Sequence, residues 1–246
     1  MLGLKNMLEL FRLRIKLLKK NSVLIIPTVA TLIFIGVMYS VTPYGVCSSF
    51  LLSAVFLYFI CLFISMVLNG KENDTYEETL LMHCVADHSY YLSRELLLIT
   101  LNFCYMFVLT SVPVILYLID NTRFTRQMEF VDVVCGGGYI LVCGLGGMAT
   151  GDLFHSRIFN KRKYAILGAV AVSVLAVSKQ GLIDFSASFG ILNFILPPIT
   201  DGLKSVGNNN FFNPLEILLI CLHMVIYYLF IVMLKILLLE KKKFRY

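Results

Sequence analysis

Long apolar runs separated by shorter polar stretches make up most of the sequence. Six runs are expected to be membrane-spanning helices, at residues 23–39, 50–68, 96–119, 131–153, 164–177 and 215–239. An α-helix needs roughly 20 apolar residues to cross about 30 Å of hydrocarbon, and most of the runs approach or exceed that length. The pattern therefore predicts an all-α fold, a polytopic membrane protein in which residues 1–246 form a single transmembrane domain.

The first twenty residues mix apolar and basic positions with helical periodicity. Apolar side chains recur at three- and four-residue spacing at Leu4, Leu8, Phe11 and Ile15, and basic residues fill much of the remainder. An amphipathic helix of this kind lies in the plane of the lipid headgroups. A helix of a soluble domain shows the same pattern, but this segment leads directly into a span, which favours an interfacial helix over residues 1–20. The segment lacks a small-residue cleavage site, so the first span is expected to act as the insertion signal.

The connector at residues 178–214, before the last span, has mixed character. Its middle, residues 189–199, is apolar but too short to cross a bilayer, and Pro197 and Pro198 lie near its end. Irregular backbone at membrane depth occurs only where protein or a cavity surrounds it. We therefore expect a re-entrant connector on the extracytoplasmic side.

Composition and charge support a membrane location and set an orientation. Apolar residues make up 59% of the chain and charged residues 15%, whereas soluble domains have about 25% charged residues. Seventeen of the 21 lysines and arginines lie in the N-terminal helix, after the second or fourth span, or at the C-terminal end. Basic residues accumulate on the cytoplasmic side, so we expect a multi-pass plasma-membrane protein with both termini in the cytoplasm. Its basic residues would meet membrane lipid and no nucleic acid.

Motifs for enzymatic chemistry are missing from the sequence. It has no GxxxxGK[ST], HExxH or GxSxG segment, and none of its seven cysteines forms a CxxC pair. The chain is therefore not expected to be an enzyme or to bind a cofactor or metal of its own. Cys47 and Cys135 both fall near the predicted outer face, and whether they pair as a disulfide is left open.

The fourth and sixth predicted spans carry residues that are unusual for a lipid-facing helix. Gly144, Gly147 and Gly151 in the fourth span suit close helix packing, or alternatively a flexible helix along a translocation path. His223 in the last span suits a hydrogen bond inside the bundle, or a place along that path.

Charged residues near the ends of spans are expected to reach water. Lys235 would extend its ammonium group to the inner membrane surface, and Asp152 lies at the end of the fourth span. On this interpretation no pair of carboxylates lies within the membrane, which argues against a proton-driven carrier.

The loop at residues 70–95 is the most polar long stretch and contains a short amphipathic segment. Thr75 can cap a helix there, and Glu77 and Glu78 fall in its first turn, where the helix dipole favours anions. Leu80 and Leu81 add an apolar patch. The segment suits a docking surface for another protein, and the alternative is a solvated loop with a capped turn.

The chain as a whole resembles the permeases of type-2 ABC exporters. In that family an N-terminal interfacial helix precedes six spans, and the loop after the second span carries a coupling helix that contacts the ATPase subunit. The matching residues are Glu72, Thr75, Glu78, Leu80, Leu81, Val85 and Arg94. Asp74 and Cys84 stand where the family has glycine and proline. The basic loop 155–163 would be a second cytoplasmic contact.

The resemblance implies a set of coupling residues and a set of partners. The expected ATPase-coupling residues are Glu72, Thr75, Glu77, Glu78, Leu80, Leu81, Arg94 and Arg157. The partners would be an ATP-binding cassette subunit, which would hold ATP and Mg, and a second copy or homologue of the permease. The mechanism would be alternating access.

The substrate expectation comes from the aromatic residues of the second span and from the resemblance. Few charges and an aromatic set suit amphipathic or hydrophobic cargo, although several of these side chains suit a lipid-facing position equally well; the set is Phe50, Phe56, Tyr58, Phe59 and Phe63. We expect export of a peptide, such as an antimicrobial peptide, and the alternatives are a lipid or a hydrophobic drug. A different class of function is a scaffold or immunity protein that does not transport.

Overall fold

The chain folds into a bundle of long helices. The computed structural model describes residues 2–20, 22–71, 80, 87–159, 161–186, 190, 192–206 and 210–241. The α-helices are α1 (Leu2–Lys20), α2 (Ile25–Met38), α3 (Val46–Lys71), α5 (Asp87–Ile119), α6 (Phe130–Leu153), α7 (Ser156–Phe159), α8 (Arg162–Phe185), α9 (Leu192–Ile195) and α10 (Pro214–Lys241). Short 3-10 helices are η1 (Ser22–Leu24), η2 (Asn121–Arg123) and η4 (Asp201–Ser205). These residues include no β-strand, which confirms the all-α prediction.

Five helices are long and apolar enough to cross a membrane, which confirms the prediction of a transmembrane protein. They are Val46–Gly70, Ser89–Ile119, Phe130–Leu153, Arg162–Phe185 and Pro214–Lys241. The fourth of them is longer than expected, because α8 continues through Lys179 to Phe185 instead of ending near residue 177. Lys179 does not end the helix because its ammonium group is ion-paired with Asp201 at 2.8 Å inside the protein.

The first predicted span is the exception. Helix α2 has 14 residues, which corresponds to about 21 Å at 1.5 Å per residue, less than the hydrocarbon thickness. The segments Met7–Lys20 and Ser22–Met38 meet the criteria for a span only when they are taken together, and they are bent by 68°. The described part of the chain therefore has five helices that are long and apolar enough to span a membrane, or six if this bent pair is one span.

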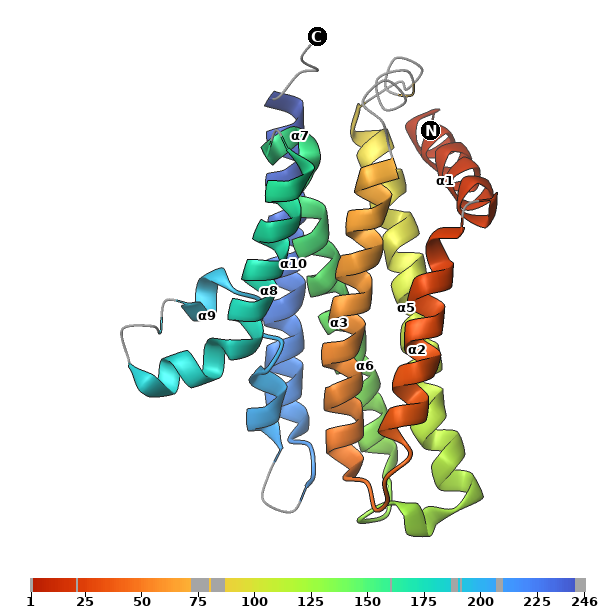
Figure 1. Ribbon diagram of the computed structural model, residues 1–246, viewed down its shortest axis with the longest axis vertical. Coiled ribbons are helices and arrows are strands. Elements are labelled where there is room, and N and C mark those ends of the chain that lie inside the picture. The colour runs from red at the N-terminus through yellow and green to blue at the C-terminus, as the bar shows by residue number, and fades with distance from the viewer. Residues whose placement is uncertain are drawn as a thin grey trace.

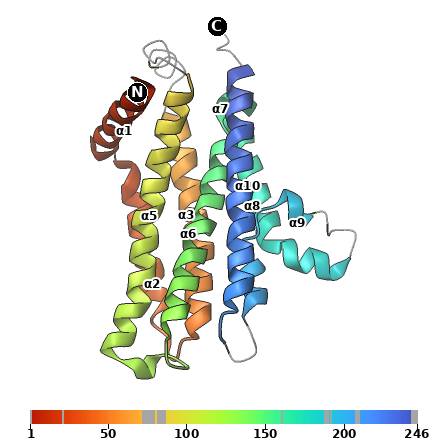
Figure 2. The ribbon, with the colours of Figure 1, turned by 180° about the vertical axis from the view of Figure 1, so that it is seen from behind.

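Both ends of the chain lie at the same end of the bundle, which we call the terminal end (Figures 1 and 2). Helix α1 lies there beside the start of α5, and α7 and the end of α10 lie there as well. At the opposite end, the backbone around Tyr44 is hydrogen-bonded to the loop before α6, with Tyr44 N to Arg123 O and Thr125 N to Tyr44 O both at 2.8 Å. Helix α8 turns away from the bundle before it ends, and the short α9 follows on the same side (Figure 1).

The centre of the bundle is the contact between α3 and α6, and α6 also packs against α5 and α10. Glycines of α6 permit this close approach. A Cβ atom on Gly147 would collide with the carbonyl oxygen of Tyr58, and one on Gly151 would lie 2.6 Å from the carbonyl oxygen of Leu62. A Cβ atom on Gly144 would overlap the side chain of Asn102 on α5. All three glycines therefore lie at packed helix contacts.

Candidate functional site

Four ionisable side chains from three helices meet inside the bundle. Arg94 and Glu95 come from α5, Asp152 from α6 and Lys235 from α10. Each of these side chains is at most 6% exposed. Together with Tyr228 of α10 they form what we call the ion cluster. An ionisable residue within a membrane-spanning helix is costly to bury and in most cases marks a functional position.

Every carboxylate oxygen of the ion cluster accepts a hydrogen bond. Arg94 Nη2 donates to Asp152 Oδ1 at 2.5 Å, and Lys235 Nζ donates to Asp152 Oδ2. The same Nζ donates to Glu95 Oε1 at 2.9 Å, and the Tyr228 hydroxyl donates to Glu95 Oε2 at 2.9 Å. Two cations therefore balance two anions. Such a network holds its helices in one arrangement, because removal of any of the four charged members leaves an unbalanced charge in a medium of low polarity.

Local sequence explains how the members of the ion cluster reach one another. Tyr228 and Lys235 are seven residues apart on α10, which places them on one helical face two turns apart. Met224 and Ile231 are buried on the same face. Asp152 follows Gly151, whose lack of a side chain lets the end of α6 approach α3. Buried packing on both helices thus directs the charged groups inward.

The ion cluster corrects three expectations drawn from the sequence. Lys235 does not extend to the membrane surface, and Asp152 does not reach water, since each side chain is 1% exposed. The expectation that no carboxylates pair within the spans is also wrong, because Glu95 and Asp152 share the ammonium group of Lys235. The sequence did contain a signal, namely the helical spacing of Tyr228 and Lys235 on one face of α10.

The predicted ATPase-coupling residues are placed only in part. Glu72, Thr75, Glu77, Glu78 and Leu81 lie outside the described residues. Arg157 is in α7, at the terminal end, and its side chain is also outside the description. Leu80 is half-buried and packs against a small apolar cluster made of Tyr90 and Tyr91 of α5 and Leu239 of α10. Arg94 is in the ion cluster, where its side chain is 2% exposed and bonded to Asp152 instead of being displayed to a partner.

His223 is not part of the ion cluster. It is half-buried on α10 and makes no hydrogen bond with any residue that the structure describes. The two interpretations of this histidine, a partner within the bundle and a place along a path, therefore remain predictions.

A second set of polar contacts stabilises the loops at the end of the bundle opposite the terminal end. The guanidinium of Arg126 donates two hydrogen bonds of 2.7 Å to Asp132 and one of 2.8 Å to the carbonyl oxygen of Asn210, and it lies 3.8 Å above the ring of Phe211. The bonds to Asp132 raise the pKa of Arg126 above its usual value. Cys47 donates its thiol hydrogen to the same carbonyl of Asn210 at 2.9 Å. These contacts join α3, the start of α6 and the start of the segment before α10.

Cys47 and Cys135, whose pairing the sequence left open, are both free thiols in this structure. Cys47 is buried, and Cys135 is half-buried on α6. The bond from Cys47 to Asn210 uses the thiol, so the structure describes a state in which the two cysteines are not paired.

A third polar group holds the connector before α10. Lys179 is fully buried and ion-paired with Asp201, which corrects its expected place in an extracytoplasmic connector. The hydroxyl of Tyr139 on α6 donates to the carbonyl oxygen of Ile199, and Gly202 N donates to that hydroxyl at 3.2 Å. Helix α9 has four residues, so it does not cross a membrane, and the re-entrant arrangement remains a prediction.

No other chemistry emerges from the described part of the chain. Within it, no group of three histidine, cysteine, aspartate or glutamate side chains is placed to hold a metal ion. Comparisons with protein-family models, with curated proteins and with solved structures gave no match. The ion cluster and its position in the bundle are therefore the features of this chain that indicate a function.

Proposed function

We propose that this chain is the transmembrane subunit of an ATP-driven ABC exporter that moves amphipathic or hydrophobic cargo, foremost a peptide, out of the cell. The observation that supports the proposal is the position of Arg94 and Glu95. They lie about two turns into α5, at the end of the segment 70–95 that the sequence predicts to contact an ATPase, and they are bonded to α6 and α10. The chain itself would hydrolyse no ATP.

The ion cluster gives this arrangement a mechanical role. A displacement of loop 70–95 by an ATPase subunit would move the start of α5, and the bonds from Arg94 to Asp152 and from Glu95 to Lys235 would carry α6 and α10 with it. Leu80 adds an apolar contact between that loop and the cluster that α5 and α10 form through Tyr90, Tyr91 and Leu239. Interfaces of this kind transmit small shifts because a packed, ion-paired contact changes between discrete states.

The number of spans and the orientation belong to the same proposal. A chain whose two ends lie at one end of the bundle crosses a membrane an even number of times, so the bent pair Met7–Lys20 and Ser22–Met38 would be the sixth span beside the five long helices. The terminal end would face the cytoplasm, because it carries most of the lysines and arginines.

The cargo path would be completed by a second copy or a homologue of the chain. Phe50 and Tyr58 of the expected aromatic set are fully buried in the core, so they do not line an open path within one chain. Phe59 and Phe63 are 41% and 37% exposed on the outer face of α3. A path between two permeases would use such exposed apolar faces, which suits amphipathic peptides better than sugars or ions.

Co-expression with the candidate ATPase tests the proposal. The chain is purified by a tag, and the ATPase that accompanies it is assayed in the wild type and in a Glu78→Ala, Leu81→Ala variant. A matched control is Asp184→Asn on the exposed surface of α8. We expect the ATPase to co-purify with the wild type and the control, and the loop variant to lose the partner or its stimulation. If no ATPase accompanies the intact chain, the scaffold or immunity function is favoured instead.

A further inference from the structure

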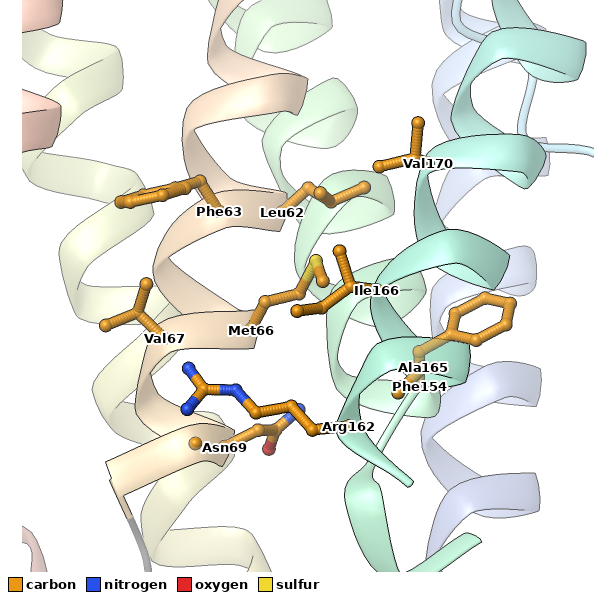
Figure 3. A pocket seen from close by; sticks show the side chains of 11 residues that line it. Leu62, Phe63, Met66, Val67, Asn69, Phe154, Arg162, Ala165, Ile166 and Val170 are labelled. Atoms are coloured by element: carbon orange, nitrogen blue, oxygen red, sulfur yellow. The ribbon is translucent and has the colours of Figure 1, made fainter. Parts of the chain in front are cut away.

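A groove between α3 and α8 has an apolar body and a polar end. It encloses about 270 Å³ and is lined along most of its length by Leu62, Phe63 and Met66 of α3 and Ile166 and Val170 of α8. The polar groups gather at the end nearest the start of α8, as Figure 3 shows for Arg162 and Asn69. The volume lies just below the range of about 300–1,000 Å³ of ordinary ligand pockets. A groove of this size and polarity fits one hydrocarbon chain with a polar head.

The apolar body of the groove is open toward the outside of the helix bundle. Phe63, Ile166 and Val170 are 37%, 41% and 49% exposed, and all three lie on helices that are long and apolar enough to cross a membrane. A hydrocarbon chain can therefore enter from the bilayer without leaving an apolar environment.

The polar end of the groove offers a cation that has no partner among the residues the structure describes. Arg162 is exposed and makes no hydrogen bond or ion pair with any described residue. Its guanidinium lies over Gly70, where a Cβ atom would be 2.5 Å from Nη2. Arg162 is also the first residue of α8, whose first turn has no acidic side chain and whose N-cap residue, Lys161, makes no capping hydrogen bond. Free amide groups and a guanidinium together favour a phosphate.

The same end of the groove offers a buried acceptor. Asn69 is 5% exposed, and its Nδ2 donates to the carbonyl oxygen of Gly151 at 3.1 Å. Its Oδ1 is buried and has no hydrogen-bond partner. An unpaired buried acceptor is costly, and this one lies in the lining of the groove beside Arg162. A ligand in the groove that carries a hydrogen-bond donor would satisfy this oxygen.

We infer that this groove binds an anionic phospholipid with a hydroxylated headgroup, of the chemistry of phosphatidylglycerol. The phosphate lies on Arg162 and the start of α8, a headgroup hydroxyl donates to Asn69 Oδ1, and one acyl chain fills the apolar body between α3 and α8. This binding rests only on the membrane location of the chain and is independent of the proposed export function.

Native mass spectrometry of the detergent-purified chain, titrated with defined phospholipids, tests the inference. We expect phosphatidylglycerol to bind more tightly than phosphatidic acid, which has no headgroup hydroxyl, and more tightly than phosphatidylcholine, which has no net charge. Arg162→Gln is expected to weaken phosphatidylglycerol binding by about tenfold, the effect of losing one charge-assisted contact. Lys163→Gln makes the same change of charge one residue further on, at a position that does not line the groove, and is expected to leave binding unchanged.

Two further variants separate the parts of the site. Asn69→Leu is expected to remove the preference for phosphatidylglycerol over phosphatidic acid, and Val170→Phe to weaken both lipids by filling the apolar body. Circular dichroism and the elution volume of each variant verify that it is folded. Equal losses in the Arg162 and Lys163 variants, or no preference of the wild type among the three lipids, would overturn the inference, since either result indicates nonspecific attraction of lipid to a basic surface.

Discussion

Lys235 on α10 donates a hydrogen bond of 2.9 Å to Glu95 on α5, although 140 residues separate them along the chain. The same ammonium group is bonded to Asp152 on α6, so one side chain connects three helices. The contact lies less than two turns before the end of α10 at Lys241 and close to the loop that the sequence predicts to meet an ATPase. Under the proposed function, the charged groups of the bundle interior connect a movement of loop 70–95 to a movement of α6 and α10.

Asp152 has the largest expected effect on stability. Asp152→Asn removes an anion that accepts from both Arg94 and Lys235, and it leaves two cations with one carboxylate. Breaking a buried pair in this way costs about 3–5 kcal/mol. The melting temperature of the detergent-purified protein should fall clearly. Asp184→Asn on the surface of α8 is the control, with an expected change within about 0.5 kcal/mol, and equal melting temperatures for both variants would contradict the ion cluster.

The pair Lys235 and Glu95 should show energetic coupling. Lys235→Met and Glu95→Gln are measured singly and together, in a double-mutant cycle of unfolding free energies. Because the two groups are bonded to each other and share the network with Asp152, the double variant should be less destabilised than the sum of the singles, with a coupling energy of about 0.5–3 kcal/mol. Additive effects would indicate that the two side chains do not touch.

Two glycines of α6 should respond in opposite ways to alanine. Gly147→Ala places a methyl group against the carbonyl oxygen of Tyr58, which forces α3 and α6 apart. Gly138→Ala has open space around the new methyl group and gains helix propensity of about 0.5–1 kcal/mol. Thermal unfolding should therefore show a loss for the first variant and no loss or a small gain for the second. A tolerated Gly147→Ala would rule out the close contact.

Reactivity of Cys47 reports on the loops at the end opposite the termini. Arg126→Gln removes the bidentate bond to Asp132 and weakens the hold on Asn210, whose carbonyl also accepts from Cys47. Modification of Cys47 by a small maleimide, followed by mass spectrometry of the peptides, should become faster. Arg123→Gln is the matched control, because Arg123 is 43% exposed and its one ion pair among the described residues is with Asp120, three positions before it. Similar modification rates of Cys47 in both variants would show that the contacts of Arg126 do not protect this thiol.

The span count can be tested by reporters at the two termini. A reporter that is active only in the cytoplasm should be active at either end of the chain, since both ends lie at one end of the bundle and six crossings return the chain to its starting side. Activity at only one terminus would show an odd number of crossings, in which case α1 and α2 do not form a span.

The sequence predicted the long helices because apolar length is a local property. The runs at 50–68, 96–119, 131–153 and 215–239 each fall within one observed helix. The sequence-based prediction was wrong about the surroundings of Lys235 and Asp152, and the reason is physical. A charged residue near the end of a span has the same local sequence whether it faces the membrane surface or the bundle interior, and its partners lie 83 and 140 residues away in the chain.

The end of α8 shows the same limit. Lys179 and Gln180 suggest the start of a polar connector, yet the helix continues because Asp201, 22 residues further on, neutralises Lys179 inside the protein. The coupling residues of loop 70–95 were proposed from a resemblance, and among them the structure describes the side chains of Leu80 and Arg94. The packing of Leu80 could not be predicted from its own segment, since the cluster it packs against includes Leu239 near the other end of the chain.

Transport into inverted membrane vesicles shows whether this chain exports peptide at the expense of ATP. Vesicles containing this chain and its co-purified ATPase are given a fluorescent amphipathic peptide with ATP or with a non-hydrolysable analogue. We expect peptide to accumulate with ATP only, and Glu95→Gln combined with Lys235→Met to reduce accumulation while the ATPase still binds. Accumulation that is the same with the analogue as with ATP, or none in the presence of a bound and active ATPase, would contradict the proposal that this chain is the membrane subunit of a peptide exporter.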